Sequence, residues 1–359
     1  MIVLYVTGHG FGHATRAAAL ARALKDRQPG LPLQVRTSAP AWIFQQTCPG
    51  LPVSRGGADA GLVQRDALDV DLEASLRAQR ALDRSWPALV EAEARWLRRL
   101  RASLVVADIP PLAFAAAAKA GAPAVGVSTF CWDWILEPYA MEDGRWRAAQ
   151  RRCAEAYALA QAAYRLPLHG DFPSFRRVVD VPLVCRRSAR GREDFDRRHG
   201  LRGKSRPLVL VAFGGFGLGP LRLSARQDLR GFLFAGYGPK PQGLRADWLR
   251  LPARDANGQL DALAACDVVV GKPGYGVVAE ALAHGKRMLY LPREGFRETA
   301  ALVSGLRRRG ACASIAREEF FAGRWRGPLE ALLSIPAPRA VAADGARWLA
   351  GELLDKVLK

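Results

Sequence analysis

Short apolar runs rich in β-branched residues alternate with helical segments through both halves of this sequence. The chain opens with MIVLYVT, passes through the helix-like HATRAAALARALKDR and becomes extended again at PLQVRTS. The same order returns after residue 206, where PLVLVAF and DVVVG flank a further strand and helix. Strands that alternate with helices in this way pair in parallel and are covered by helices on both faces. The sequence therefore predicts an α/β fold of two doubly wound, Rossmann-like domains.

The segment between these two alternating patterns is rich in charge and poor in large apolar side chains, which is typical of a connection between domains. A chain of 359 residues also exceeds the size at which one core usually keeps growing. We predict a first domain over residues 1–185, a linker over 186–206, a second domain over 207–335 and a closing helix over 336–359.

The composition limits the partners of the chain. The net charge is +19, but only 8 of the 53 basic residues are lysine and the arginines are scattered, so no nucleic-acid partner is predicted. The charge suits an anionic partner, either a nucleotide substrate or a peripheral contact with an anionic membrane surface. The six cysteines form no CxxC pair, which argues against a metal site or disulfide framework. No membrane-spanning run and no basic leader are visible, so the expected location is the cytoplasm.

The stretch GHGFGH at residues 8–13 follows the first predicted strand and precedes a helix, which is where open parallel sheets bind ligands. It is not the GxGxxG fingerprint, and the second strand lacks the acidic residue that would hold a ribose, so NAD chemistry loses support. No carboxylate or cysteine cluster accompanies the two histidines as metal ligands. His13 is the candidate catalytic residue because it begins the helix at the mouth of a cleft, although a structural role is the alternative. The rest of the loop is predicted to line the acceptor side: His9, Gly10, Phe11 and Gly12.

The stretch GKPGYG at residues 271–276 also joins a predicted strand to a helix. Its bare backbone amides and the positive helix end suit a diphosphate, and Glu280 one turn later could accept two hydrogen bonds from a ribose. An ordinary helix-capping turn is the alternative. No GxxxxGK[ST] motif supports ATP-driven phosphoryl transfer. The predicted donor-binding residues here and in the glycine-rich turn at 213–219 are Gly214, Gly215, Gly271, Lys272, Gly274, Tyr275, Gly276 and Glu280.

The aromatic stretch STFCWDWILEPY follows another predicted strand in the first half. Trp132 could stack on a sugar ring and Asp133 could bind its hydroxyls, which would place both in an acceptor site. The alternative is that the tryptophans belong to the core.

Together these segments resemble the GT-B glycosyltransferases, and more closely the N-terminal glycosyltransferase-like region of L-arabinokinase proteins. A looser similarity is to the N-acetylglucosaminyltransferase that forms lipid II. The resemblance runs in order through nearly the whole chain up to about residue 320. It rests on YVTGHGFGHATR, RDALDVDLEASL, LVVADIPP, CWDWILEPY, FPSFRRVVDVPLVCRR, GKPGYGVVAEAL and REGFRE.

The resemblance implies two Rossmann-like domains facing across a cleft. It also implies metal-independent, cofactor-free transfer of a sugar from a nucleotide-sugar donor, UDP-linked by analogy, to an unidentified acceptor hydroxyl. His13 matches a loop histidine that acts as general base in related transferases, oriented by an aspartate such as Asp108. Glu280 matches the residue that contacts the donor ribose. The donor-sugar contacts of the family correspond to Glu294, Arg297 and Glu298.

Two departures from the family pattern keep other functions open. Positions that usually carry hydroxyl residues are Val277 and Ala279 here, which favours a non-catalytic sugar-nucleotide-binding module as the alternative. A sugar-nucleotide epimerase on the same fold is a third hypothesis. No sugar-kinase phosphate loop is present in these residues, so we do not expect arabinose phosphorylation.

Overall fold

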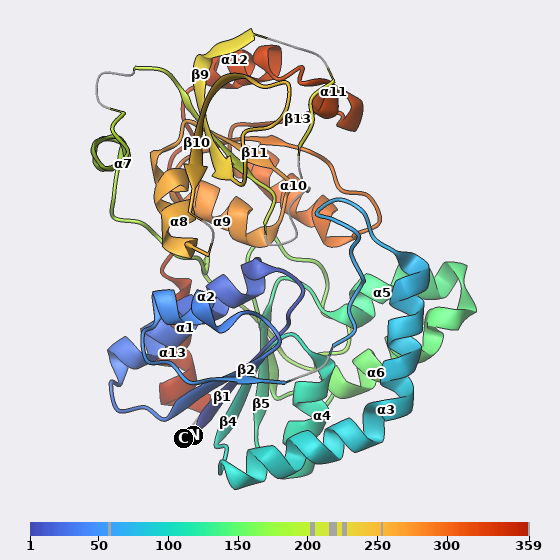
Figure 1. The fold of residues 1–359 in the computed structure, drawn as a ribbon. Helices are drawn as coiled ribbons and strands as arrows, with labels where there is room; N and C mark the ends of the chain where they lie inside the picture. The colour runs from blue at the N-terminus through green and yellow to red at the C-terminus, as the bar shows by residue number, and fades with distance from the viewer. Residues whose placement is uncertain (57–58, 202–204, 215–220, 225–227, 253, 358–359) are drawn as a thin grey trace.

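The computed structural model describes residues 1–56, 59–201, 205–214, 221–224, 228–252 and 254–357. Its strands form two sheets, which lie one above the other in Figure 1, each with its own helices. The strands of both sheets pair in parallel. The predicted α/β fold with two doubly wound halves is therefore confirmed.

The first sheet has seven strands, with β4 at its centre and β1 beside it. The residues of β1 are all buried, because helices cover both faces of the sheet. The helices are α1 (Phe11–Arg27), α2 (Ala41–Thr47), α3 (Leu72–Arg99), α4 (Pro111–Ala120), α5 (Trp132–Glu142) and α6 (Arg147–Tyr157). In spatial order the strands are β3 (Val53–Arg55), β2 (Leu33–Thr37), β1 (Ile2–Val6), β4 (Leu104–Asp108), β5 (Ala124–Ser128), β6 (Ala162–Arg165) and β7 (Val178–Asp180).

The second sheet has six strands arranged around β8. Its helices are α8 (Ala256–Ala265), α9 (Tyr275–Ala283), α10 (Glu298–Arg309), α11 (Arg317–Ala322) and α12 (Arg326–Ser334), while α7 (Arg192–Arg198) lies between the two sheets in sequence. In spatial order the strands are β10 (Arg245–Leu251), β9 (Asp228–Tyr237), β8 (Leu208–Ala212), β11 (Val268–Gly271), β12 (Arg287–Tyr290) and β13 (Cys312–Ser314).

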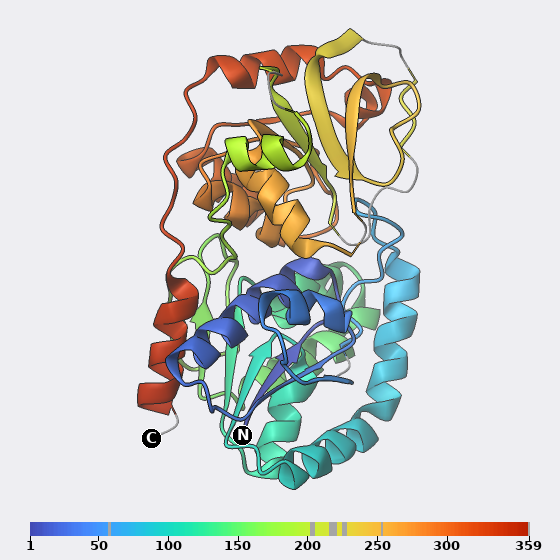
Figure 2. The same cartoon turned by 60° about the vertical axis from the view of Figure 1, so that its left-hand side comes forward.

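The end of the chain returns to the first domain. Helix α13 (Gly345–Glu352) and the π-helical turn after it (Leu353–Val357) pack against α1, below the second domain in Figure 2. On the way back, Val341 N–H donates to the Leu282 carbonyl and Gly345 N–H donates to the Leu183 carbonyl. The chain therefore passes between the domains twice, along neighbouring paths.

The two domains also share one cluster of buried apolar side chains. Ala14 and Ala18 of α1 belong to the same buried cluster as Val278 and Leu282 of α9. At the facing ends of these helices the contact is between glycine backbones: a Cβ added to Gly276 would lie 3.1 Å from the Cα of Gly12. Glycine at these positions permits the close approach of the two helix N-termini.

Candidate active site

One cavity lies where loops from both sheets meet. The spatial order of the strands reverses at β1 and β4 in the first sheet and at β8 and β11 in the second, and open parallel sheets bind ligands at such points. The cavity holds about 100 Å³. Ligand pockets usually hold roughly 300–1,000 Å³, so a nucleotide sugar requires the walls to separate. The lining residues are His9, Gly10, Phe11, Gly12, His13, Arg16, Gln64, Phe130, Trp132, Gly214, Lys272, Gly274, Tyr275, Gly276, Val277, Arg293, Phe296 and Glu298.

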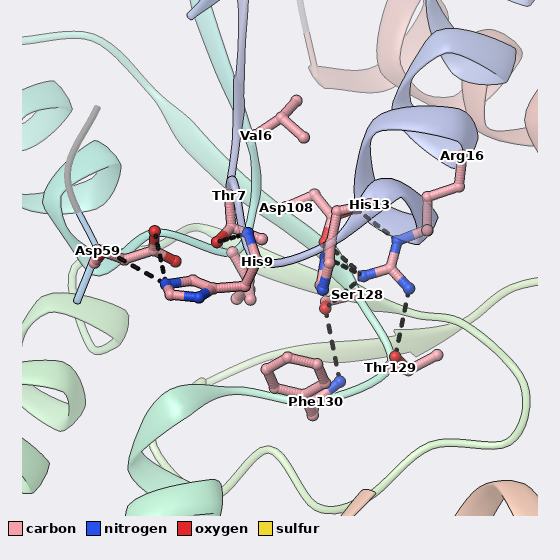
Figure 3. Close-up of polar contacts among 12 residues, drawn as sticks. Val6, Thr7, His9, His13, Arg16, Asp59, Asp108, Ser128, Thr129 and Phe130 are labelled. Atoms are coloured by element: carbon pink, nitrogen blue, oxygen red, sulfur yellow. Dashed lines mark hydrogen bonds and ion pairs between the residues drawn. The ribbon is translucent and has the colours of Figure 1, made fainter. Parts of the chain in front are cut away.

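His13 and Asp108 form a buried pair in the first-domain wall (Figure 3). The pairing of β1 with β4 brings the two residues together. Asp108, the last residue of β4, lies beside Val6, the last residue of β1, and the chain after Val6 turns through the glycine loop into α1, which carries His13. His13 Nδ1 lies 2.9 Å from Asp108 Oδ1. The two side chains therefore lie close together, as predicted.

A third member of this cluster is Arg16, one helical turn after His13. Its Nε and Nη2 donate to the two oxygens of Asp108, each at 2.5 Å, and its side chain is 3% exposed. Burial opposes ionisation of Asp108, but Arg16 and then His13 outweigh it and hold the pKa of this carboxyl at about 2. Arg16 is not among the site residues predicted from the sequence, although its spacing of three from His13 on one helix is a usable signal.

The hydrogen bonds of Arg16 also decide the tautomer of His13. Nη2 of Arg16 lies 2.8 Å from His13 Nδ1, but its two protons are accepted by Asp108 and by Ser128 Oγ at 3.1 Å. We therefore assign a proton to Nδ1 of His13, which donates it to Asp108. This tautomer leaves the lone pair of the ring on Nε2, the form that a general base needs.

Positive charge dominates the second-domain wall. Helix α9 begins at Tyr275 with Gly274 as its N-cap, so its first amides and the positive end of its dipole lie at the cavity. Burial and the neighbouring Arg293 lower the pKa of Lys272 to about 8. The Arg293 guanidinium stacks on Phe296, 4.2 Å from the ring centroid. Tyr275 is fixed by its hydroxyl, which donates to the carbonyl of Val184.

The predicted donor residues do not all reach the cavity. Gly214, Lys272, Gly274, Tyr275 and Gly276 line it. Gly271 ends β11 behind them, where a Cβ would collide with the Ala212 carbonyl. Gly215 lies outside the described residues.

Glu280 is placed differently from the expectation. It is 3% exposed and does not line the cavity. Its Oε1 accepts from Nε and Nη2 of Arg186 at 3.0 and 2.8 Å, in a buried ion pair between α9 and the segment after β7. A ribose contact by Glu280 thus requires this pair to rearrange, and the contact stays a prediction.

The REGFRE segment is oriented differently from the prediction. Glu294 is exposed and outside the cavity lining, and Arg297 stacks on Trp134 and donates to Glu137 at 2.5 Å. Glu298 does line the cavity, where its Oε1 accepts from the Thr129 hydroxyl at 2.6 Å. Arg293 and Phe296 occupy the cavity wall from this segment, whereas Glu294 and Arg297 do not reach it. The donor-sugar contacts of Glu294, Arg297 and Glu298 stay predictions.

The residues predicted to bind the acceptor differ in their relation to the cavity, and their contacts with an acceptor stay predictions. His9, Gly10, Phe11, Gly12 and Trp132 line the cavity. Asp133 is 1% exposed and accepts from Ser174 at 2.6 Å, away from the cavity lining. The carboxylate near Trp132 is that of Asp59, which accepts from the indole Nε1 at 3.1 Å and lies 3.6 Å from His9 Nε2 (Figure 3).

Among the residues that the structure describes, no group of three His, Cys, Asp or Glu side chains gathers as metal ligands. Among the helices that the structure describes, none combines the length and the apolar character needed to cross a bilayer.

The paired parallel sheets and the cavity between them define the GT-B glycosyltransferase fold. Solved structures with this fold cover 98–99% of the chain at 13–19% identity. They include the glycotransferase of kitacinnamycin (TM-score 0.61, covered to 94%) and a UDP-glucosyltransferase from Polygonum tinctorium (0.59, covered to 98%). MurG of Acinetobacter baumannii matches with a TM-score of 0.55 over 99% of its length. The GT-B prediction is thereby confirmed.

In sequence the chain is similar to L-arabinokinase of Arabidopsis thaliana. The two are 35% identical over 338 residues, which cover 92% of this chain. The chain spans about a third, 32%, of the length of that relative. The resemblance inferred from the motifs is confirmed, and no family model matches the chain.

Proposed function

We propose that this protein is a glycosyltransferase that moves a sugar from a nucleoside diphosphate to an acceptor hydroxyl. One observation carries the proposal: a single cavity at the switch points of both sheets has a His13–Asp108 pair in one wall and an anion-binding wall opposite. The anion-binding wall combines the N-terminus of α9 with Lys272 and Arg293. A base and an anion site that face one another suit transfer from a donor with an anionic leaving group.

In the proposed reaction, Nε2 of His13 accepts the proton of an acceptor hydroxyl, and the oxygen of that hydroxyl attacks the anomeric carbon of the donor. The bond between this carbon and the diphosphate breaks, and the nucleoside diphosphate leaves with the bonding electrons. The α9 N-terminus and Lys272 stabilise the charge that develops on the leaving group. Asp108 and Arg16 hold the imidazole in the required tautomer.

We propose UDP as the nucleotide of the donor. The fold supports this choice by analogy, since one solved structure that matches the chain is a UDP-glucosyltransferase. The acceptor enters on the side of His9 and Trp132, where an aromatic face and the nearby Asp59 suit a hydroxylated ring.

The first test is a thermal-shift series with UDP, dTDP and GDP and their sugar conjugates. A ligand that binds only the folded state raises Tm in proportion to the logarithm of its excess over Kd, so at a hundredfold excess we expect a rise of a few degrees with the UDP series. Mass spectrometry then follows UDP release with and without candidate acceptors. A lack of any shift with every nucleotide would remove the proposal.

A non-catalytic nucleotide-binding module is the second candidate, and one observation favours it. Val277 is among the residues that line the cavity, at a position where the resemblance leads us to expect a hydroxyl residue. Ala279 does not add to this argument, because it is fully buried in the core shared by the domains. Nucleotide binding without UDP release would support the module. Conversion of the sugar of the donor to another sugar in the absence of an acceptor would indicate an epimerase.

The pKa of Lys272 makes donor binding dependent on pH. Since this pKa is lowered to about 8, the ammonium is charged at pH 7 and loses its proton as the pH rises through 8. We expect the Kd for a UDP-sugar to rise about tenfold between pH 7 and pH 9, because the neutral amine attracts the diphosphate less. Isothermal titration calorimetry measures this change. The Lys272→Arg variant, which keeps its charge, should show a nearly flat profile, and an equally steep profile in that variant would assign the titration to another group.

A further inference from the structure

A segment of the first domain reaches across to the second domain. Residues 61–71, which we call the arm, begin and end at the first domain but extend to the second domain (Figure 1), and Gln64 within the arm lines the cavity. Its base is held by Gln79, whose amide donates to the Gly61 carbonyl at 2.9 Å, and by Ser75 Oγ, which accepts from Val63 N–H at 2.8 Å. The arm folds back on itself through an antiparallel bridge between Gln64 and Val70.

The tip of the arm is part of the second domain's core. Ala67 and Leu68 are 0% and 3% exposed and belong to the cluster that also contains Phe213 and Phe320. Beside them, both nitrogens at the end of the Arg317 side chain donate to Asp69, each at 2.7 Å. A first-domain segment is thus fixed to the second domain by apolar burial and by a bidentate ion pair.

Between base and tip, the arm presents Gln64 to the cavity. Its Oε1 is buried and has no hydrogen-bond partner among the described residues. The same holds for Nε and Nη2 of Arg293, which line the cavity from the second domain. Buried polar atoms are nearly always paired in folded proteins, so these atoms, contributed by both domains, indicate a polar ligand between them.

We propose that Gln64 and Arg293 bind the sugar of the donor, so that the transferred ring is held between the arm and the second domain. This inference rests on the proposed function. It gives Gln64, a residue of the first domain, a role in selecting the sugar of the donor. Gln64 Oε1 would accept from a sugar hydroxyl, and Arg293 would donate to the ring oxygen or to hydroxyl oxygens.

The chemistry of the two groups favours the sugar over the diphosphate. The diphosphate of a nucleotide sugar offers only acceptors at neutral pH, so Gln64 Oε1 can pair only with a hydroxyl or N–H group of the ligand. Lys272 and the N-terminus of α9 already supply donors and positive charge for the phosphates. The ribose and base are the competing sources of a donor, and they are common to UDP and UDP-sugars.

The test compares UDP with the UDP-sugar that gives the largest thermal shift, using calorimetric Kd values for wild type and Gln64→Leu. We expect the variant to bind the UDP-sugar about tenfold more weakly and to bind UDP within about twofold of wild type. The control is Arg65→Ala, since the Arg65 side chain lies on the same arm but is 69% exposed. It should change neither Kd.

Monodeoxy analogues of the UDP-sugar give a readout that is independent of folding. For wild type, the Kd of one deoxy analogue should be about tenfold higher than the Kd of the parent UDP-sugar. For Gln64→Leu, the same analogue and the parent should have equal Kd values. Equal losses for UDP and UDP-sugar in Gln64→Leu, no loss for either, or a wild type that binds no UDP-sugar more tightly than UDP would each overturn the inference. The proposed function survives these three outcomes, because its own tests are nucleotide binding by wild type and the release of UDP.

Discussion

Replacing His13 with alanine is expected to lower the rate of UDP release by about 10²–10⁴-fold, because the variant loses the group that accepts the acceptor's proton. Donor affinity should change little, since the diphosphate is held by the opposite wall with Lys272 and the N-terminus of α9. Single-turnover UDP release, with water or an identified acceptor, measures the rate, and calorimetry measures the Kd of the donor.

The Asp108→Asn variant keeps His13 but changes its tautomer, so it tests the tautomer separately from the presence of the imidazole. The amide nitrogen of asparagine can donate to Nδ1 of His13, which would move the ring proton to Nε2 and take the lone pair away from the acceptor. We expect a loss comparable to that of His13→Ala, and the double variant should be little worse than either single one. A wild-type rate in His13→Ala removes this residue from the mechanism.

Replacing Arg16 with methionine is expected to destabilise the protein by about 3–5 kcal/mol, the usual cost of leaving one partner of a buried ion pair uncompensated. Asp108 loses both of its bidentate hydrogen bonds in this variant, and the side chains of both partners are almost fully buried. Urea unfolding monitored by circular dichroism gives the free energy of unfolding. The matched control is Arg22→Met on the same helix, because Arg22 pairs with Asp26 at the surface and should contribute less than about 1 kcal/mol.

The pH dependence of the Arg16→Met deficit identifies its cause. Folding lowers the pKa of Asp108 to about 2 in wild type, so the folded state binds fewer protons than the unfolded state between about pH 4 and pH 2. The stability that Asp108 contributes is present above this window and is lost as the pH falls through it. In the variant the buried carboxyl can be protonated without loss of a partner, so the deficit should shrink towards pH 4 and below. A deficit that is constant with pH would mean that lost packing, and not the uncompensated charge, destabilises the variant.

The parts of the site that could be predicted from the sequence follow directly from strand order. His13 and Asp108 come after β1 and β4, which are adjacent parallel strands, so the βα pattern alone places both side chains at one edge of the sheet. The glycine stretch before α9 is predictable for the same reason, because it follows β11 beside β8. Hydrophobic periodicity predicts these strands and helices, and their order along the chain predicts which strands are adjacent in the sheet.

Side chains whose position depends on partners far away in sequence could not be predicted in this way. Arg186 pairs with Glu280 across 94 residues, and no local pattern marks the two as partners. The loop before α10 has no periodicity, so the choice between Arg293 and Arg297 as the cavity residue depended on the loop's conformation. Asp59 lies in an irregular stretch after β3, where its contact with Trp132 across 73 residues carries no sequence signal.

The position of the arm on the second domain could not be predicted from the sequence, although residues 65–71 belong to the stretch RDALDVDLEASL that carries the resemblance. Ala67 and Leu68 form a two-residue apolar run among charged neighbours, which by itself is typical of an exposed turn. Their burial depends entirely on the second domain, whose core is built from residues more than 140 positions later in the chain.

The two chain crossings described earlier set the mechanics of substrate entry. Residues 182–184 and 341–345 run next to one another between the domains, and Figures 1 and 2 place these crossings on the opposite side of the molecule from the arm. Because both connections lie on one side, we expect any opening of the domains to be smallest there and largest on the side of the arm. Entry of a substrate would then require the contacts of Ala67, Leu68 and Asp69 with the second domain to break first.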